Sequence, residues 1–538
     1  MDNKSTDIVF VTPSKIPDMR QESIGTLILA QKAYTNNFEV AIVRFWEASQ
    51  ANYNVFAEEI CNRIFAHNPQ IVSFYCRGNE YHILIDLARR IKKLSNITIV
   101  FGGPQAELVA EETLNHFPCV DYICCGEGEN TIVPLLNMIL HNNKEVAKLT
   151  IPGLVYRNEN GTIRKNNLPD LLPDNYTHND LYYNLVPENV IRISRSVTID
   201  AGRGCPFSCT FCSTKTFWKQ KYRLRDLANT IYEIEYVVKH FGNKLFSFSH
   251  DLFTVNKNRV SDFCDKLKDS GINIKWTCSA RIDCIDEELI KKMSSVGLVG
   301  IYYGIESGSE RMQKIINKNL SIQRCKEIIK FSVQNKVAVT ASFIYGFPEE
   351  TFDDLNKTLE FIHQLLLTGA DVQLHYLTFE KGSKLYENYK HELSFSCLAQ
   401  HNIFGVKELS DEIRKNPEIF STFWNYSSTI RNEMKYLEIF HSIGREYKNT
   451  YILLISILVN KGLNYVEAFK LVIGLIQDSL IRFEQNNVAI NKSICFFLFE
   501  KIISRLSAQS NRNICITEEE SLQLKSLLLR NNTSNIII

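Results

Sequence analysis

The sequence has almost no excess of charge of either sign, no long apolar run and nothing that resembles a secretory leader. Its 61 basic and 60 acidic residues leave a formal charge of +1, so neither a nucleic-acid nor a membrane partner is expected. The most apolar tracts, such as 451–459 and 495–499, are much shorter than the roughly 18 residues that span a bilayer. The first residues, MDNKSTDIVFVTPSK, lack the apolar core and cleavage site of a signal peptide. We therefore expect a cytoplasmic protein.

A disulfide framework is not expected either. The 15 cysteines are odd in number and scattered along 538 residues without a secretory signal, and such thiols are usually reduced. Apolar residues make up 45% and charged residues 22% of the chain, the proportions of an ordinary globular protein. At this length one hydrophobic core is not enough, so about three domains are expected.

The first 150 residues alternate apolar, strand-like runs with helical patterns, which is typical of a parallel sheet with crossover helices. The expected strands are 8–11, 40–43, 71–74, 97–101 and 122–125, and the expected helices are 24–34, 56–67, 81–94 and 106–115. Glycine-rich turns follow the last two strands, at 102–104 and 126–129. Because ligands of open α/β sheets bind beyond the carboxyl ends of the strands, these turns are candidate ligand contacts. By themselves these turns suggest only a phosphate or nucleotide contact, and the signal is weak.

The rest of the chain has three further patterns. Residues 151–190 are rich in Pro, Asn and Asp, and we expect a linker that contains one hairpin. About six βα units follow in 191–391, with strands expected at 196–200, 245–249, 274–278, 299–303, 338–344 and 372–376. Six parallel units form a partial barrel whose chemistry lies at the carboxyl ends of its strands. From 392 to 538 the pattern is helical, and four aromatic residues there are either plain core or the lining of a substrate cleft: Phe420, Phe423, Trp424 and Tyr426.

Three cysteines are grouped directly after the first strand of the βα series. Cys205, Cys209 and Cys212 form a C-x3-C-x2-C array within SVTIDAGRGCPFSCTFCSTKT. Thiolates are the usual ligands of iron–sulfur clusters, and three on one loop ligate three of four irons and leave the fourth open. The array therefore predicts a 4Fe-4S cluster with one open iron. The alternatives are chance proximity and a structural zinc site, although zinc sites usually use paired C-x2-C arms and a fourth ligand.

At these residues the chain resembles the radical S-adenosylmethionine (SAM) superfamily, including the aromatic Phe211 before the third cysteine. The resemblance extends to SFSHDLFTVN, WTCSARIDCIDEEL, GIESGSERMQKIINK and SFIYGFPEET, each at or just beyond an expected strand end. It implies that SAM chelates the open iron and that one electron cleaves it to methionine and a 5'-deoxyadenosyl radical. Four side chains have chemistry that suits SAM, although each has an alternative role as a helix cap or surface ion pair: Asp251, Ser279, Arg281 and Glu306.

Joined to such a domain, the N-terminal module resembles cobalamin-binding domains, in which a doubly wound, Rossmann-like sheet presents loops to one face of the corrin ring. The resemblance gives the cofactor-facing role to nine residues: Thr12, Ser73, Arg77, Gly102, Gly103, Pro104, Gly126, Glu127 and Gly128. The Asp-x-His-x-x-Gly motif that supplies a cobalt ligand in some of these domains does not occur in the sequence. We therefore expect cobalamin to bind without a histidine ligand (His-off). The alternative is a domain that keeps the fold and has lost the cofactor.

The two resemblances together imply an α/β protein: a cobalamin-binding Rossmann-like domain (1–150), a linker (151–190), a radical SAM core built as a partial (β/α)6 TIM barrel (191–391) and a helical C-terminal domain (392–538). They imply a methyltransferase that acts on an unactivated carbon of a peptide or small molecule. One SAM would methylate cobalt, and a second would generate the radical that activates the substrate. The implied partner is an electron donor such as flavodoxin or ferredoxin.

Two other functions stay open at this point. A radical SAM peptide maturase, for example an epimerase, would quench the substrate radical with a thiol. The candidate thiols, each also interpretable as an inert core residue, are Cys278, Cys284, Cys325 and Cys397. An alternative of another class is a non-catalytic, cobalamin- or redox-responsive binding protein, although the intact cysteine array argues against it.

Overall fold

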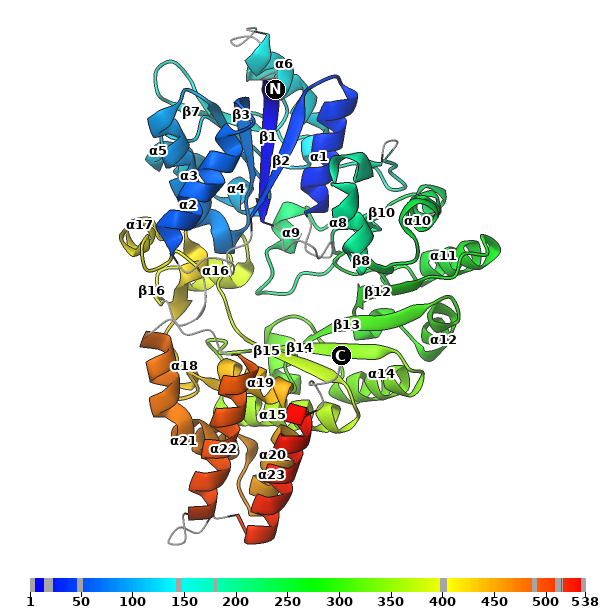
Figure 1. Cartoon of the computed structure of the whole chain (residues 1–538), viewed down its shortest axis with the longest axis vertical. Coiled ribbons are helices and arrows are strands. Elements are labelled where there is room, and N and C mark those ends of the chain that lie inside the picture. The colour runs from blue at the N-terminus through cyan, green and yellow to red at the C-terminus, as the bar shows by residue number, and fades with distance from the viewer. Residues whose placement is uncertain are drawn as a thin grey trace.

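The structure is a computed structural model of the chain. It describes residues 5–13, 23–45, 52–141, 148–178, 181–396, 404–485, 491–508, 514 and 516–533, without the side chains of 189, 483–485 and 531–533. Figure 1 shows three regions: a sheet with helices at the top, formed by the N-terminal part, a curved sheet below and to its right, and a group of C-terminal helices at the bottom.

The N-terminal region is a doubly wound sheet, as expected. Its strands are β1 Thr6–Pro13, β2 Val40–Phe45, β3 Pro69–Tyr75, β4 Thr98–Gly102, β5 Tyr122–Cys124, β6 Leu154–Arg157 and β7 Ile163–Lys165, and its helices are α1 Ile24–Thr35, α2 Tyr53–Phe65, α3 Tyr81–Leu94, α4 Pro104–Leu108, α5 Ala110–His116 and α6 Ile132–Leu140. The strand order is β2-β1-β3-β4-β5-β6-β7, and β1 to β5 are parallel. Alternate residues of β1 face opposite layers: Val9 and Val11 pack with α2 and α3, and Ile8 and Phe10 pack with α1 and α6.

The hairpin that we expected inside a linker is instead the edge of this sheet. Strand β6 pairs antiparallel with β5, and β7 pairs antiparallel with β6. Leu154, Val155 and Tyr156 are all buried, at 4% exposure or less, because helices cover both faces of β6. Because both faces of β6 carry apolar side chains, burial within the sheet stabilises this strand as it stabilises the parallel strands.

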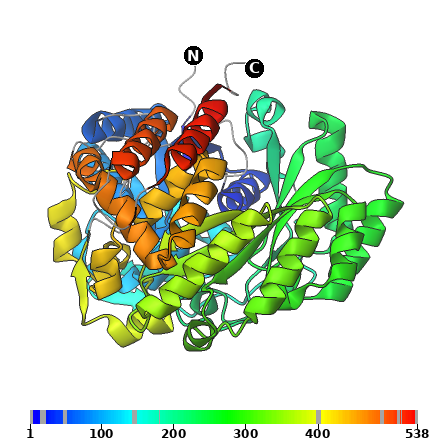
Figure 2. The ribbon, with the colours of Figure 1, turned by 90° about the horizontal axis from the view of Figure 1, so that it is seen from below.

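The second region is a six-stranded parallel sheet in the order β15-β14-β13-β12-β11-β8, which is the sequence order expected for a partial barrel. Its strands are β8 Ser196–Asp200, β11 Leu245–Ser249, β12 Lys275–Ala280, β13 Leu298–Glu306, β14 Ala338–Tyr345 and β15 Asp371–Tyr376. The helices that connect them are α10 Leu227–Phe241, α11 Lys257–Asp269, α12 Glu287–Ser295, α14 Ile322–Gln334 and α15 Phe352–Leu367. In Figure 2 these green strands fan out with their helices along the outer side. All six expected strands are confirmed.

The C-terminal region adds helices to the β15 edge of the barrel. They are α18 Thr429–Glu433, α19 Leu437–Glu446, α20 Lys448–Asn460, α21 Tyr465–Gln485, α22 Lys492–Ala508 and α23 Glu518–Thr533. The preceding helix, α17 Ser410–Lys415, packs instead on the N-terminal region through Ile413. Helix α19 packs on β15 and α21 packs on α15, so that these helices share one core with the barrel. The region also contains an antiparallel pair, β16 Leu393–Phe395 with β17 Trp424–Tyr426. We expected helices alone, but three-residue strands are too short to give an alternating pattern.

The aromatic residues that we considered for a substrate cleft belong to packed cores. Phe420 is 1% exposed and its ring lies 6.2 Å from that of Tyr81 on α3. Phe423 is equally buried, and its ring lies edge-on to His82 at 5.0 Å. The remaining pairs are Phe395–Trp424 and Tyr389–Tyr426. For Phe420 and Phe423 the cleft interpretation was wrong, because their segment packs on helix α3 of the N-terminal region.

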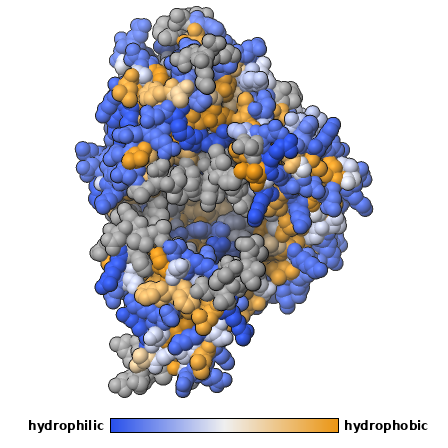
Figure 3. All heavy atoms as spheres, in the orientation of Figure 1, coloured by the Kyte–Doolittle hydropathy of each residue, from blue (hydrophilic) through white to orange (hydrophobic). Residues whose placement is uncertain are grey.

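Among the described helices, no single one is long and apolar enough to cross a bilayer. Helix α20 and the 465–482 part of α21 pass that test only as a pair, bent by 119°. Figure 3 shows a face that mixes hydrophilic and hydrophobic residues and is hollowed between the N-terminal region and the C-terminal helices.

Candidate functional site

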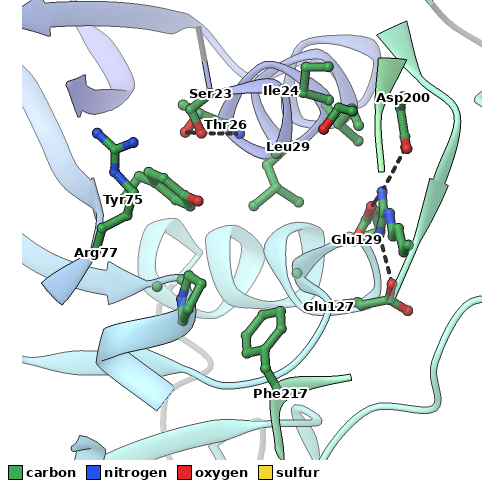
Figure 4. Close-up of a pocket in the computed structure, with 18 of the residues that line it drawn as sticks. Ser23, Ile24, Thr26, Leu29, Tyr75, Arg77, Glu127, Glu129, Asp200 and Phe217 are labelled. Atoms are coloured by element: carbon green, nitrogen blue, oxygen red, sulfur yellow. Dashed lines mark hydrogen bonds and ion pairs between the residues drawn. The ribbon is translucent and has the colours of Figure 1, made fainter. Parts of the chain in front are cut away.

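A cavity of about 930 Å³ separates the N-terminal sheet from the barrel. One wall consists of the loops after β3, β4 and β5 together with the first turns of α1. The opposite wall consists of the carboxyl ends of β8, β11 and β12 and of a turn that follows the cysteine array. Figure 4 shows Tyr75 and Phe217 reaching into this space from the two halves. The cavity thus lies where both βα topologies predict a ligand.

Most of the residues predicted to contact cofactors meet at this cavity. From the N-terminal sheet it is lined by Ser73, Arg77, Gly102, Gly103, Pro104, Gly126, Glu127 and Gly128. From the barrel it is lined by Asp251 and Ser279. Thr12 is fully buried behind this wall, and Phe211 packs against Phe347 with ring centroids 6.0 Å apart. Neither Thr12 nor Phe211 lines the cavity.

The cysteine array lies on the loop after β8, with all three thiols partly buried. Two neighbouring segments fix this loop at Thr210: its amide donates to the Ile316 carbonyl at 3.0 Å, and its carbonyl accepts from the Leu385 amide at 2.8 Å. Burial raises the pKa of the Cys205 thiol to about 11, and Cys212, Asp251 and Cys209 add to that rise. Burial likewise raises the pKa of Cys212. A thiolate here therefore needs a cation such as iron to stabilise it.

The array has the ligand chemistry of an iron–sulfur cluster. In the described ranges, no three His, Cys, Asp or Glu side chains converge closely enough to hold a single metal ion. An iron–sulfur cluster does not require that convergence, because each thiolate binds a different iron. The Nη1 atom of Arg281 lies 3.8 Å from the sulfur of Cys209, and its guanidinium covers the Phe207 ring at 3.9 Å. A buried cation thus lies beside the array and favours negative charge on it.

Asp251 and Ser279 are the two predicted SAM contacts that the cavity exposes. Asp251 is exposed at the cavity surface. Neighbouring atoms still limit its hydration and raise the pKa of its carboxyl, while the Gly204 amide opposes that rise. Arg281 is buried instead beneath the cysteine loop, where Nε donates to Asp283 at 2.7 Å and Nη2 donates to the Lys318 carbonyl. It touches the cysteine array, not the cavity.

Glu306 ends β13 in a strained conformation. Its φ angle is +71°, and the pairing of β13 with β14 shifts register between Gly304 and Glu306. Its carboxylate accepts from Lys318 Nζ at 2.6 Å, and both side chains are about nine-tenths buried. A Cβ atom at Gly304 would lie 2.5 Å from this carboxylate, so glycine makes room for the pair. Strain of this kind often marks functional sites, but the carboxylate already has a cationic partner.

The corrin-facing candidates are loops whose backbone conformation requires glycine. Gly103 has a φ of +102°, and a Cβ there would lie 3.0 Å from the Cys76 carbonyl. Gly126 has a φ of +81°, and a Cβ there would lie 2.8 Å from Pro169. Such turns bring backbone rather than side chains to the cavity wall. Among the described residues of the N-terminal sheet, no histidine lines the cavity.

The structure adds residues that we did not predict. These are Ser23 and its neighbours on α1, Phe217 and Trp218 after the cysteine array, and three polar residues of the barrel side, Asp200, Arg203 and His250. Burial lowers the pKa of His250 to about 4, so this imidazole is neutral near pH 7. Asp200 and Arg203 precede the array in the sequence, and charge at the carboxyl end of the first barrel strand is the signal that could have found them.

Two family models match the chain: the B12 binding domain over residues 19–136 and the radical SAM superfamily over residues 199–362. An uncharacterized methyltransferase of Pyrococcus horikoshii is 30% identical over 333 residues, which are 61% of this chain and 71% of that protein. An anaerobic magnesium-protoporphyrin IX monomethyl ester cyclase of Cereibacter sphaeroides is 29% identical over 312 residues, which are 56% of this chain and 50% of that protein.

The fold is similar to that of a solved structure, the cobalamin-dependent S-adenosylmethionine radical enzyme OxsB with aqua-cobalamin and S-adenosylmethionine bound. The TM-score is 0.61 at 14% identity, and the alignment covers 99% of this chain and 85% of that one. At this identity the likeness shows a shared fold that includes the C-terminal helices.

Proposed function

Because this chain belongs to the family of radical SAM proteins that carry a B12-binding domain, we propose that it methylates an unactivated carbon of a peptide or small molecule. It is a cobalamin-dependent radical SAM enzyme, with a 4Fe-4S cluster, SAM and cobalamin as its cofactors. It is therefore not the non-catalytic binding protein that we also considered. Methyl transfer is supported by the Pyrococcus horikoshii relative, whereas the cyclase is a relative of nearly equal identity with another reaction.

One observation carries this proposal: a single cavity is lined by candidate residues for both cofactors. The loops at 102–104 and 126–128 form one wall, and Asp251 and Ser279 lie on the other. A reaction that uses a radical and a methyl donor requires both to reach the same substrate atom. A cavity lined by candidate residues for both cofactors supports that arrangement.

When bound, the cluster with SAM supplies a carbon-centred radical, and cobalamin supplies a methyl group. Cys205, Cys209 and Cys212 would hold three irons of the cluster. Asp251 and Ser279 offer oxygen atoms to hydroxyl and ammonium groups of SAM. The glycine turns would hold the corrin through backbone groups.

The test is a labelled methyl transfer. The enzyme is reconstituted anaerobically with iron, sulfide and cobalamin, reduced, and given SAM with a deuterated methyl group together with fractions of peptides and small metabolites. We expect 5'-deoxyadenosine, S-adenosylhomocysteine and a product that carries the labelled methyl group on carbon. Production of 5'-deoxyadenosine with neither S-adenosylhomocysteine nor a labelled product would exclude methylation.

The matched control is the cysteine array. We expect Cys209→Ala to lose most of the iron and all 5'-deoxyadenosine, because three thiolates are the minimum for such a cluster. Cys264→Ala changes a buried core thiol on α11 and should keep both. Equal iron content in the two variants would contradict the role of the array.

The structure does not favour the thiols that we considered for the epimerase alternative. The described candidate thiols Cys278, Cys284 and Cys325 are buried, and none of them lines the cavity. Cys397 lies outside the described residues. A thiol that quenches a substrate radical has to reach the substrate. Solvent deuterium at an unmethylated product carbon would nevertheless favour that reaction over methylation.

A further inference from the structure

We infer that Arg203 is a positioning residue that fixes the cysteine-bearing loop against the corrin-facing loop, and thereby the separation of the two cofactors. The inference rests on the proposed function, because it concerns where both cofactors sit in that site. Arg203 precedes Cys205 by two residues, and its guanidinium crosses the interface to the loop at 126–129 of the N-terminal sheet.

Arg203 holds three carboxylates with one guanidinium. Its Nη1 atom lies 2.9 Å from Oε1 of Glu127, and its Nη2 atom lies 2.6 Å from Oε1 of Glu129. The same Nη2 atom lies 3.4 Å from Oδ2 of Asp200, at the end of β8. Figure 4 shows Glu127, Glu129 and Asp200 turned toward this group. A planar fork that engages several acceptors fixes direction as well as distance.

The carboxylates are themselves held in place. Glu127 Oε2 accepts from Arg223 Nη1 at 2.8 Å and from the Leu172 amide at 2.5 Å. Asp200 accepts from the Tyr176 hydroxyl at 2.8 Å and pairs with His178 Nε2 at 2.8 Å. We call the charged members of this network the interdomain clasp: Glu127, Glu129, Asp200, Arg203 and Arg223.

The backbone on each side of Arg203 is equally fixed. Arg203 and Arg223 pair in the short antiparallel ladder of β9 Gly202–Arg203 and β10 Arg223–Leu224. A Cβ atom at Gly202 would lie 2.7 Å from the Arg223 carbonyl. Gly204 has a φ of +82°, and a Cβ there would lie 2.0 Å from the Lys221 carbonyl. A movement of the Arg203 side chain is therefore transmitted to the loop that begins at Cys205.

The clasp is buried although it faces the cavity. The side chains of Arg203, Glu127, Glu129 and Asp200 are 11%, 2%, 10% and 5% exposed. Buried charges stabilise a protein only when their hydrogen-bond geometry is good. Such a network therefore adds little net stability, but it strongly favours one arrangement of the two regions. An interface that only held the two regions together would not require these buried charges.

The experiment measures the magnetic interaction between the reduced cluster and cob(II)alamin by electron paramagnetic resonance of the fully loaded enzyme. A lysine at position 203 keeps the charge but cannot engage Glu127 and Glu129 at once. We expect Arg203→Lys to keep its iron and cobalt contents while the magnetic splitting falls by roughly a third. A site that loses its supporting contacts loosens by about 1 Å, and a dipolar interaction decreases with the inverse cube of the distance between the two spins.

Arg157→Lys is the matched control, because Arg157 donates to the carbonyls of Leu114, Phe117 and Val120, all within the N-terminal region and outside the clasp. It should lose stability without a change in the splitting. If Arg203→Lys fails to bind cofactors, Glu129→Gln decides, since it removes one arm of the clasp and keeps a side chain of equal size. Wild-type splitting in the loaded 203 or 129 variant, or no splitting in the loaded wild-type enzyme, would overturn the inference. Failure of the wild-type enzyme to bind cobalt would count against the proposed function instead.

Discussion

Among the contacts that join the N-terminal sheet to the rest of the described chain, two have opposite character, and both lie apart from the packing of Leu27 and Ile28 on the barrel core. At the cavity, the interdomain clasp connects it to the barrel through buried charges. Against α2 and α3, it is covered by an apolar contact from the C-terminal region, which consists of Ile413, Ile419, Phe420 and Phe423. These four side chains are at most 1% exposed.

The difference indicates a division of roles. Apolar burial is strong and has no preferred direction, so it keeps two surfaces together and tolerates small shifts between them. Hydrogen-bonded ion pairs contribute less net stability but lose it quickly when their geometry changes. The apolar contact therefore attaches the N-terminal sheet to the molecule, and the clasp orients the sheet at the place where the cofactors meet. Breaking each contact separately tests this division.

The largest effect is expected from Arg203→Met. This change leaves Glu127, Glu129 and Asp200 buried with one cation fewer, and removing one partner of a buried ion pair costs about 3–5 kcal/mol. Denaturant unfolding of the anaerobically purified protein measures the loss. As a control, Arg445→Met removes an ion pair with Asp371 whose side chains are 36% and 40% exposed, and it should cost about 1 kcal/mol or less. Equal losses in the two variants would show that the buried ion pairs of the clasp stabilise the protein no more than an exposed pair does.

A smaller loss of stability is expected from Phe420→Leu, which removes part of the apolar contact. The change keeps an apolar side chain but leaves part of the space between Tyr81 and Phe117 unfilled, at a cost of about 1–2 kcal/mol. The same unfolding measurement applies. The magnetic splitting between the cofactors should stay at its wild-type value. A changed splitting here would mean that the apolar contact also orients the sheet.

The sequence was sufficient to predict most of the fold. Helix α3, Tyr81–Leu94, has the expected bounds, because its apolar residues follow a clear helical period. The parallel strands are also confirmed, since buried strands are short apolar runs that end in turns. The hairpin at 154–165 was predicted, but its place at the edge of the sheet and the strands β16 and β17 were missed because both depend on pairing partners. Local pattern carries no information about those partners.

Within the site, the sequence predicted those features that consist of residues close together in the chain. The cysteine array and the glycine turns are continuous in sequence, and the structure brings ten of the predicted contacts to one cavity. Arg203 was missed because its partners Glu127 and Glu129 are more than 70 residues away. The apolar contact was missed for the same reason, since Phe420 is over 300 residues from Tyr81. Both contacts are tertiary: the place of Arg203 after the first barrel strand marks it as a cavity residue, but no local motif predicts its partners.

Acid should weaken the clasp and not the apolar contact. Burial opposes ionisation of Glu127, but the Arg223 hydrogen bond and the Arg203 charge outweigh it and lower the pKa of this carboxyl. A carboxyl with a lowered folded-state pKa adds stability above its unfolded pKa of about 4.3 and loses it as pH falls further. Glu127→Gln should therefore cost most near pH 7 and progressively less below about pH 4. Unfolding midpoints of the iron-free protein at both pH values measure this, and a cost that does not change with pH would contradict it.

The smallest effect is expected at the edge of the apolar contact, where Arg89 on α3 pairs with Glu412 on α17 at 2.5 Å. These side chains are 35% and 27% exposed, and ion pairs in contact with solvent contribute about 1 kcal/mol or less. Glu412→Gln should therefore shift the unfolding midpoint only slightly, and about 1 M salt should remove the difference by screening. The comparison depends on this result. A large loss that persists in salt would mean that charge also fixes this side of the sheet, and the clasp would no longer be the one contact that sets its orientation.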